Sequence, residues 1–412
     1  MMLMRPRTLC VWLILASRGE LYAFCDGAST PAAGPLSGLR PNPGGASQNP
    51  APELPAETLG VGTLAGTSAA RVYVADVAIS HISDGRIRVF DAEKGRFLGL
   101  ISTGYAGNFA VSPAANELYV ATSYLARGSR GERSDVLEVH DTQTLGFKYE
   151  VLLPTKRAQA LNYRGLVSVT GNGQFVLVMN ATPATSVTVV NLQTRQVASE
   201  VQTPGCWGSM PAAQGARFSM LCGDGKVATI TLNEQGQVAD RQLSDKLFDA
   251  DQDAWFHHAE RVGDRYWFVS FQGQVTELNL GGPVAQRTGQ ISLVSAKDKK
   301  NGWRPGGYQN FAVDPSGSRL VAAMHSKGAE GSHKRPAEQL WVVDLASGKR
   351  LATHPGKGTA SLTFSRNGER LQALDGMTGA LNVWRVGAGG SLKPLTSVAK
   401  AGEAALHLES ND

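Results

Sequence analysis

One phrase recurs along this chain and restricts its fold more than any other feature. Each copy reads as strand, polar turn, strand, loop, strand, Gly-containing turn and strand. Three copies are AVSPAANELYVATSY with VLEVHDTQTLGFKYEV, FAVDPSGSRLVAAM with LWVVDLASGKRLATH, and LTFSRNGERLQALDG with LNVWRVGAGGSLKPL. A period of about 40 to 50 residues, with four short strands in each unit, is typical of stacked propeller blades that cannot bury their faces alone.

The first strands of these units predict the number of blades. Opening strands begin near Asn108, Gly165, Cys206, Trp255, Tyr308 and Ala360. The first unit, near Arg71, lacks an opening strand. Ala404 to Ser410 forms a predicted strand, and no further strand of a unit follows it in the sequence. We therefore predict an all-β fold, a seven-bladed β-propeller over residues 60–412. Its C-terminal strand is expected to complete the N-terminal blade and so to remove an exposed sheet edge.

The N-terminal region has the pattern of an exported protein. Arg5 and Arg7 precede the apolar run Leu9 to Ala16, which is too short to span a bilayer, so residues 1–25 are predicted to be a secretory signal peptide. Residues 26–59 are rich in Pro, Ala and Gly and form a predicted arm without a core of its own. No internal stretch reaches the roughly 18 apolar residues of a membrane span. We expect a periplasmic location.

The cysteines fit this export prediction. If the signal is removed beyond Cys25, only Cys206 and Cys222 remain, and they bracket two predicted strands joined by a turn. An exported pair across a hairpin predicts a structural disulfide. The alternative, a redox-active pair, needs a close C-x-x-C arrangement that is absent here.

Charge and motifs exclude several classes of function. The formal net charge is +5, but no Lys/Arg run is interleaved with aromatic residues, which argues against nucleic-acid binding. A mild positive charge can instead steer an acidic protein partner. No phosphate loop, nucleophile elbow or H-E-x-x-H zinc motif occurs. Recurrent aspartates at strand ends are predicted to cap turns rather than bind metal, namely Asp91, Asp141, Asp314 and Asp344.

The histidines give no clear metal site. His257 and His258 are neighbours in a predicted strand, so their side chains point to opposite faces, and we expect one buried and one exposed. His325 and His333 flank a polar insertion, which favours a rim loop. A copper or zinc site at these histidines is the alternative, and we predict no metal.

Three insertions interrupt the repeats, at Leu125 to Asp135, Ala296 to Asn310 and residues 325–336. The second contains Trp303, Arg304 and Tyr308. Aromatic and Arg side chains exposed on insertions are typical anchors of a protein interface, and we assign these three to a partner interface. The alternative is that these residues belong to an ordinary surface loop without a binding role.

Long irregular motifs lie at and around these insertions in a fixed order. They are SRGERSDVLEVHD, LNYRGL, NATPATSVTVVNL, GCWGSMP, CGDGKVATITL, NGWRPGGYQN and KGAEGSHKRPAEQLWVVDLASGKRLA. Through them the chain resembles the heavy chains of tryptophan tryptophylquinone amine dehydrogenases, from about Arg71 to Leu408. NATPATS and SHKRPAE look closer to the aromatic amine type than to the methylamine type.

This resemblance implies a seven-bladed propeller paired with a small cysteine-rich light chain in a periplasmic α2β2 enzyme. The light chain of that family carries the tryptophan tryptophylquinone, so this chain is expected to bind no cofactor and to supply no catalytic residue. The family oxidises a primary amine to an aldehyde and ammonia, and passes electrons to a blue copper protein of the azurin or amicyanin type.

The resemblance also implies one substrate-channel residue. The family places an aromatic residue, usually Phe, in the loop that reads ISTGYAGNF here, and Tyr105 falls on that position. The Tyr hydroxyl departs from the family pattern and adds polarity to the channel. Two alternatives stay open: a stand-alone periplasmic propeller that binds a ligand or protein, and a propeller enzyme with its own site, such as a lactonase or quinoprotein. The second lacks a convergent set of acid, base or metal-binding residues.

Overall fold

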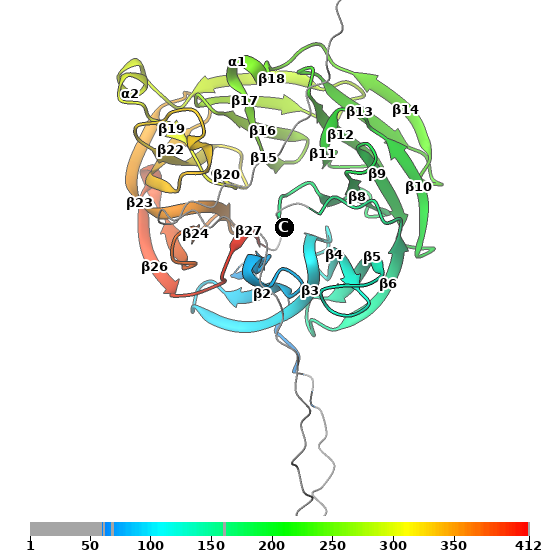
Figure 1. Ribbon diagram of the computed structural model, residues 1–412. Helices are drawn as coiled ribbons and strands as arrows, with labels where there is room; N and C mark the ends of the chain where they lie inside the picture. The colour runs from blue at the N-terminus through cyan, green and yellow to red at the C-terminus, as the bar shows by residue number, and fades with distance from the viewer. Residues whose placement is uncertain (1–59, 61, 67–69, 160–161, 411–412) are drawn as a thin grey trace, which may run out of the picture. The chain divides into compact units, whose positions relative to one another are not determined.

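The computed structural model describes residues 60, 62–66, 70–159 and 162–410. The predicted signal peptide (1–25) and arm (26–59) lie outside the described residues. Residues 60–412 form one compact unit, and within it sheets follow one another around a common axis (Figure 1). In the described part of the chain, no helix is long and apolar enough to cross a membrane.

The strands pair antiparallel in five hydrogen-bonded sheets. The first contains β27 (Ala405–Ser410), β1 (Arg71–Asp76), β2 (Gly85–Asp91), β3 (Arg96–Val111), β4 (Glu117–Leu125), β5 (Arg133–Asp141) and β6 (Phe147–Leu153). Three sheets of four strands follow: β7 (Val167–Val169), β8 (Phe175–Asn180), β9 (Ser186–Asn191) and β10 (Gln196–Gln202); β11 (Cys206–Pro211), β12 (Arg217–Cys222), β13 (Val227–Leu232) and β14 (Val238–Leu243); β15 (Trp255–Val262), β16 (Arg265–Ser270), β17 (Gln274–Asn279) and β18 (Gln286–Ser292). The last contains β19 (Arg304–Pro305), β20 (Phe311–Val313), β21 (Arg319–His325), β22 (Ala337–Asp344), β23 (Arg350–Phe364), β24 (Arg370–Asp375), β25 (Leu381–Val386) and β26 (Leu392–Val398).

The two largest sheets are joined through long strands. β3 pairs with β2 as far as Gly104 and then with β4 from Tyr105. In the same way, β23 pairs with β22 up to Thr359 and with β24 from Thr359 onward. Each long strand is therefore the last strand of one group of strands and the first strand of the next.

The predicted C-terminal strand is present as β27, and it pairs with β1 in the register Val72↔Ser410 and Val74↔Leu408. Every residue of both strands is buried. Figure 1 shows β27, in red, beside the blue N-terminal strands. The two ends of the described chain thus share one sheet.

Apolar side chains fill the space between neighbouring sheets. Val72 and Val74 of β1 lie in one cluster with Leu381 and Val383 of β25. Because strand side chains alternate between faces, strands packed on both faces are buried along their whole length. β8, for example, is buried at all positions from Phe175 to Asn180.

The turns confirm the predicted role of the aspartates. A carboxylate oxygen of Asp91 accepts hydrogen bonds from the backbone N–H groups of Glu93 and Lys94, and Asp141 does the same for Gln143 and Thr144. Asp314 and Asp344 also accept from backbone N–H groups of the turns that follow them. No group of three or more His, Cys, Asp or Glu residues within the described ranges could hold a metal ion.

Connections between strands fall on two faces because neighbouring strands alternate in direction. We call one the insertion face. It carries the connections β4–β5 (126–132), β6–β7 (154–166), β14–β15 (244–254), β18–β20 (293–310) and β21–β22 (326–336). Two short helices, α1 (Ala250–Asp253) and α2 (Ala296–Lys300), and the 3₁₀ turn Ser332–Lys334 belong to it. We call the opposite face the turn face. It carries tight turns and the 3₁₀ turn Ala388–Gly390. A third 3₁₀ turn, Ile79–His81, lies in the β1–β2 connection.

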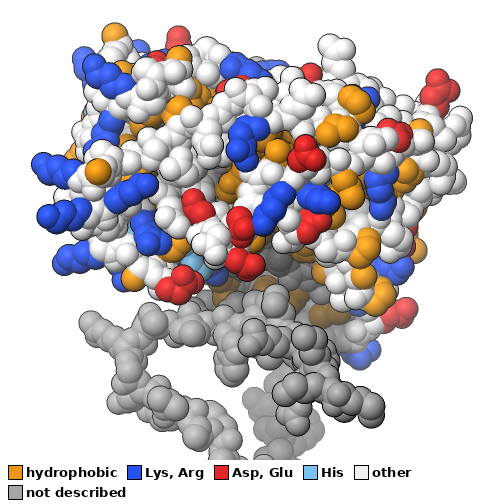
Figure 2. Space-filling model, turned by 90° about the horizontal axis from the view of Figure 1, so that it is seen from above, with side chains coloured by type: hydrophobic (Ala, Val, Ile, Leu, Met, Phe, Trp, Pro, Cys, Tyr) orange, Lys and Arg blue, Asp and Glu red, His pale blue; other side chains and the backbone are white. Residues whose placement is uncertain are grey.

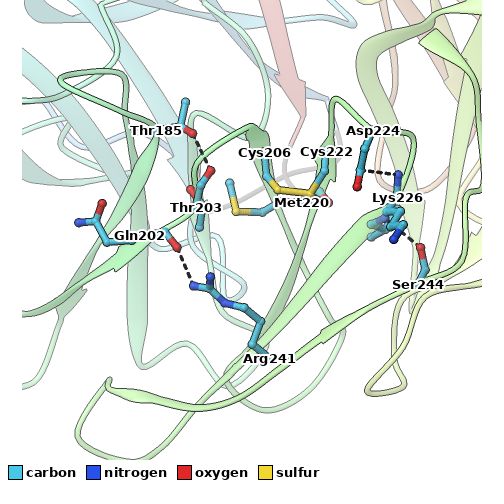
Figure 3. Close-up of a disulfide and its surroundings, with 11 residues drawn as sticks. Thr185, Gln202, Thr203, Cys206, Met220, Cys222, Asp224, Lys226, Arg241 and Ser244 are labelled. Carbon is cyan, nitrogen blue, oxygen red and sulfur yellow. Dashed lines mark hydrogen bonds between the residues drawn. A yellow bond between two sulfur atoms is a disulfide. The ribbon is translucent and has the colours of Figure 1, made fainter.

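The predicted disulfide is confirmed. Cys206 opens β11, Cys222 ends β12, and the two residues face each other in the strand pairing and are bonded (Figure 3). Both are buried in the cluster that joins the sheets β7–β10 and β11–β14. The bridge therefore ties a hairpin at its insertion-face end.

Candidate functional site

Tyr105 does not lie in a loop, and that part of the prediction is wrong. It lies inside β3, where the strand passes from its pairing with β2 to its pairing with β4. Gly104 has φ 54° and Ala106 has φ 48°, so left-handed residues lie on either side of Tyr105 within the strand. Tyr105 is half-buried, and its hydroxyl has no hydrogen-bond partner among the described residues.

Trp303 is not the exposed anchor that we predicted. Its ring is half-buried and lies 5.2 Å, centroid to centroid, from the ring of the fully buried Trp341. Arg304 lies with its guanidinium 4.4 Å from the centre of the Phe271 ring. The physical reason is packing: a loop of this length folds back and covers the apolar end of β22 rather than extending into solvent.

Tyr308 does lie at a recessed surface. A cavity of about 680 Å³ opens on the insertion face, and residues from five different connections and from β15 line it. Its aromatic lining consists of Tyr163, Trp255, Phe256, His257, Phe271 and Tyr308, with His333 and Lys334 beside them. We call it the insertion-face cavity. Sequence reasoning placed Tyr308 near a binding surface, but nothing in the pattern brought it together with Tyr163 or His257.

The rings at this cavity form a connected group. Tyr163 lies 5.3 Å from His257 and 6.2 Å from Tyr308, and Trp207 lies edge-on to His257 at 6.2 Å. Such distances are typical of aromatic pairs. Burial raises the pKa of Tyr163 to about 12 and also raises that of Tyr308, so both phenols are neutral at physiological pH. The group provides an apolar surface with a few hydroxyl donors.

His257 and His258 differ from the prediction of one exposed ring. His258 is buried, and one ring nitrogen lies 2.9 Å from the Phe311 carbonyl oxygen. His257 is half-buried between Tyr163 and Trp207, and neither of its ring nitrogens has a partner in the described structure. Burial, with a smaller effect of His258, lowers the pKa of His257 to about 4. Its imidazole is therefore neutral at pH 7.

A second cavity, of about 500 Å³, lies at the axis. It is lined by residues of β3, β7, β11, β15, β20, β23 and β27, and His257 is the residue that it shares with the insertion-face cavity. We call it the axial cavity. Lining residues in the turns at 113, 171, 213 and 315 place its mouth on the turn face. The two cavities thus approach His257 from opposite faces.

Charged groups inside the axial cavity are tied to one another. Arg164 lies 2.6 Å from a carboxylate oxygen of Glu409 and 2.7 Å from one of Glu260. His407 contacts Glu409 at 2.7 Å, and burial lowers the pKa of His407. Burial alone would raise the pKa of Glu409, but the charge of Arg164 and the hydrogen bond from His407 lower it to about 2. A carboxylate with so low a pKa is a poor general base at neutral pH.

His325 and His333 do not form a site together. His325 is buried, and its Nδ1 lies 3.0 Å from the Ser326 carbonyl oxygen, whereas His333 is exposed at the insertion-face cavity. Burial lowers the pKa of both imidazoles. The described chain therefore offers cavities, an aromatic surface and neutral imidazoles, but no poised acid and base pair.

Comparison with known proteins identifies the family. Residues 68–406 match the family model of the methylamine dehydrogenase heavy chain (MADH). The methylamine dehydrogenase heavy chain of Methylophilus methylotrophus is 25% identical over 283 residues, which cover 68% of this chain and 69% of the relative. That of Paracoccus versutus is 24% identical over 338 residues, which cover 81% and 78%.

Solved structures support the fold. The periplasmic gluconolactonase PpgL of Pseudomonas aeruginosa has a TM-score of 0.59 at 16% identity, with 82% of this chain and 98% of that chain covered. The β-propeller domain of Cps50 (Swd1) from Myceliophteria thermophila has a TM-score of 0.54 at 13% identity, with 79% and 96% covered. At such low identity these likenesses show the fold alone. The family match extends over nearly all of the described residues, and the chain belongs to the methylamine dehydrogenase heavy chain family.

Proposed function

We propose that this chain is the heavy subunit of a periplasmic, quinone-dependent amine dehydrogenase that deaminates primary aromatic amines to aldehydes and ammonia. The observation that carries the proposal is the family match over residues 68–406. The aromatic preference rests on the motifs at residues 180–186 and 332–338, which resemble the aromatic amine type. A periplasmic location rests on the signal pattern of residues 1–25, and the blue copper acceptor of the azurin or amicyanin type rests on the family resemblance.

The scaffold that we propose has seven blades. Each of the inner strands β3, β7, β11, β15, β20, β23 and β27 contributes to the axial cavity, and one blade is assigned to each. The proposed domain limits are residues 26–59 for the arm and 60–412 for the propeller. In this arrangement the repeats build a rigid platform, and the insertions provide the surface for a partner.

The quinone is assigned to the light chain, because the described tryptophans of this chain are engaged in packing. Trp341 is fully buried and its Nε1–H donates to Gln339, while Trp303 and Trp207 pack against the core. When bound in the complex, the tryptophan tryptophylquinone supplies the electron-accepting chemistry. The proposed role of this chain is to bind the light chain, to form part of the wall of the substrate channel and to exclude water from it.

The insertion face is the proposed docking surface for the small cysteine-rich light chain in an α2β2 assembly. It combines an aromatic hollow with a polar rim, which is the usual anatomy of a protein interface. Tyr308 is the anchor that we retain, Trp303 packs on Trp341, and Arg304 lies over Phe271, which lines the same cavity as Tyr308. Tyr105 is assigned to the wall of the amine channel.

The test is co-purification. The chain is expressed with a neighbouring small, cysteine-rich reading frame, and a coloured complex that oxidises 2-phenylethylamine faster than methylamine is expected. Tyr308→Arg should prevent assembly, whereas Phe147→Arg, at an exposed aromatic on the turn-face end of β6, should not. A colourless monomer that elutes alone from the native source would instead support a stand-alone binding propeller.

A further inference from the structure

The backbone of Tyr105 lies at an irregularity of β3. Tyr105 faces Ser123, but Asn108 faces Ala121, so β3 has one extra residue between these two pairs. Ala106 in this bulge has φ 48°, a left-handed conformation that costs a non-Gly residue free energy. The carbonyl groups of residues 105–107 are thus turned out of the regular β3–β4 pairing. In a buried position, each of them needs another donor.

Arg157 supplies two of these donors. From the β6–β7 connection, its Nη2 donates to the Tyr105 carbonyl oxygen at 2.9 Å, and its Nη1 donates to the Ala106 carbonyl oxygen at 2.9 Å. Asn162, from the same connection, donates to the carbonyl oxygen of Gly107. Three successive carbonyl groups of β3 are therefore held by side chains of a single neighbouring segment. No other side chain donates to the Tyr105 carbonyl oxygen in the described part of the molecule.

Arg157 is itself held in place. It is 3% exposed, and its Nη2 also donates to the Ser123 hydroxyl at 2.8 Å. That hydroxyl donates to the buried Asp135 carboxylate at 2.6 Å, which also accepts from Arg133 at 2.5 Å and 2.7 Å. Burial lowers the pKa of Arg157 to about 10, so the guanidinium stays charged at physiological pH. A planar fork with fixed donors defines the positions of two carbonyl groups at once, which an ammonium group cannot do.

We propose that Arg157 is a positioning residue that fixes the Tyr105 backbone and thereby sets which amines pass the channel. The inference rests on the proposed role of Tyr105 in the channel wall. Because the Tyr105 hydroxyl has no partner among the described residues, its ring is placed by the backbone and by packing alone. The cluster of Arg157, Ser123 and Asp135 thus affects amine selectivity through the position of Tyr105, without contacting the amine.

A double-mutant cycle on the assembled enzyme tests the coupling. Arg157→Lys, Tyr105→Ala and the double variant are compared by the ratio of kcat/KM for 2-phenylethylamine to kcat/KM for methylamine. We expect Arg157→Lys to change this ratio by about 10-fold, since a displacement near 1 Å far from the chemistry can have such an effect. In the Tyr105→Ala background the same substitution should leave the ratio unchanged.

The isolated heavy chain gives a second readout that does not depend on activity. Amide hydrogen exchange of the peptide 103–109 should become at least about 10-fold faster in Arg157→Lys, because the bulge loses its two-point support. Arg71→Lys is the matched control. Arg71 is also 3% exposed and also donates to backbone carbonyl groups, at Thr142 and Ala65, but it lies at the turn face. It should lower stability without changing exchange at 103–109 or the amine ratio.

Each result has one meaning. Unchanged exchange at 103–109 in Arg157→Lys overturns the positioning role, and so do additive effects on the amine ratio in the double variant. If exchange rises but Tyr105→Ala leaves the amine ratio unchanged, the proposed channel role of Tyr105 fails, and the selectivity assigned to Arg157 fails with it. Faster exchange together with a ratio change that depends on Tyr105 supports the inference.

Discussion

Tyr105, which we assign to the channel wall, lies at the start of a β-bulge in an otherwise regular strand. It lies where β3 passes from its pairing with β2 to its pairing with β4, so small backbone shifts there move the ring relative to both groups of strands. In our assignment Tyr105 takes the place of a channel residue that is usually Phe in the enzymes that the chain resembles, and the hydroxyl is the chemical difference. We therefore expect substitutions of Tyr105 to alter which amines the enzyme prefers.

Replacing Tyr105 with Ala should change amine selectivity and leave the quinone intact. Removal of the ring widens the channel, and we expect kcat/KM for bulky aromatic amines to change relative to methylamine by about 3- to 10-fold. Steady-state kinetics with a series of amines gives the ratio, and the visible spectrum of the complex reports the quinone. Tyr149→Ala, at a half-buried ring below Arg195, is the control. Equal losses for every amine would argue against a channel role.

His257 should make the chain less stable in mild acid. Its pKa is lowered from 6.5 to about 4, so between these values the unfolded chain holds a proton that the folded chain does not. The free energy of unfolding must then fall as the pH falls, by up to about 2 kcal/mol between pH 7.5 and 5. His257→Phe keeps the contacts with Tyr163 and Trp207, and it should flatten this slope in urea titrations at several pH values.

The control for this pH effect is His81→Gln, at an exposed ring. It should leave the slope as in the unchanged chain. Part of the slope should persist in His257→Phe, because burial also lowers the pKa of His325 and His407. A His257→Phe variant with the full original slope would contradict the assignment.

At the scale of elements, the β11–β12 hairpin has a covalent support that its neighbours lack. Cys206 and Cys222 are partners in the strand pairing, and nearby strands are linked by hydrogen bonds such as Thr185 to the Thr203 carbonyl (Figure 3). A bridge across the open end of a hairpin restricts the unfolded chain more than the folded one. The hairpin also places Trp207 beside His257.

Cys206→Ala with Cys222→Ala should lower the free energy of unfolding by about 3 kcal/mol, as expected for a loop of this size on the chain-entropy account. Urea unfolding measures the difference. Under a strong reductant the unchanged chain should lose a similar amount, while the double variant should not respond. A reductant effect of equal size in both proteins would show that the loss has another origin.

On the scale of the whole molecule, charge is unevenly distributed. Figure 2 shows Lys and Arg side chains gathered at the left end of the view, the side on which α2 lies in Figure 1. Exposed basic residues occur on α2 and in the β21–β22 connection, namely Lys297, Lys299, Lys300, Lys327, Lys334 and Arg335. Such a region can speed the approach of an acidic partner, with an effect that salt reduces.

The pairing of β27 with β1 is a long-range contact that joins the two ends of the described strands. Besides the strand pairing, the side chain of Gln309 bonds both the N–H and the C=O of Leu408, and Ser361 donates to the Leu406 carbonyl. These bonds attach the last strand to β23 and to the segment before β20. The end of the chain therefore contributes to several neighbouring sheets.

A chain that ends at Lys400 should be much less stable than the full chain. Loss of β27 exposes Val72 and Val74 and leaves the inward edge of β1 unpaired, so we expect the free energy of unfolding to fall by about 5 kcal/mol or more. Thermal unfolding gives the comparison, and a chain that ends at Ser410 is the control. An unchanged melting temperature for the shorter chain would rule out a stabilising role for this pairing.

The strand repeats, the turns and the disulfide could be predicted from the amino-acid sequence. Alternating apolar residues, Asp at strand ends and two cysteines that bracket a hairpin act through local geometry, which can be recognised over a few residues. The pairing of the C-terminal strand with the N-terminal strands was also predictable, because the first unit lacked an opening strand and the end of the chain contained a strand without a partner in its own unit. The irregular motifs at the insertions indicated the family.

The contacts of the insertions could not be predicted from local sequence patterns. Arg157 bonds a carbonyl group 52 residues away, and Arg164 bonds a carboxylate 245 residues away. Trp303 turned out to be half-buried on Trp341, and Tyr105 to lie within a strand. The physical reason is that loops have no hydrophobic period, and that the partners of a buried polar group come from whichever sheets the closed arrangement brings beside it. Those partners are fixed by three-dimensional packing, and no local pattern encodes them.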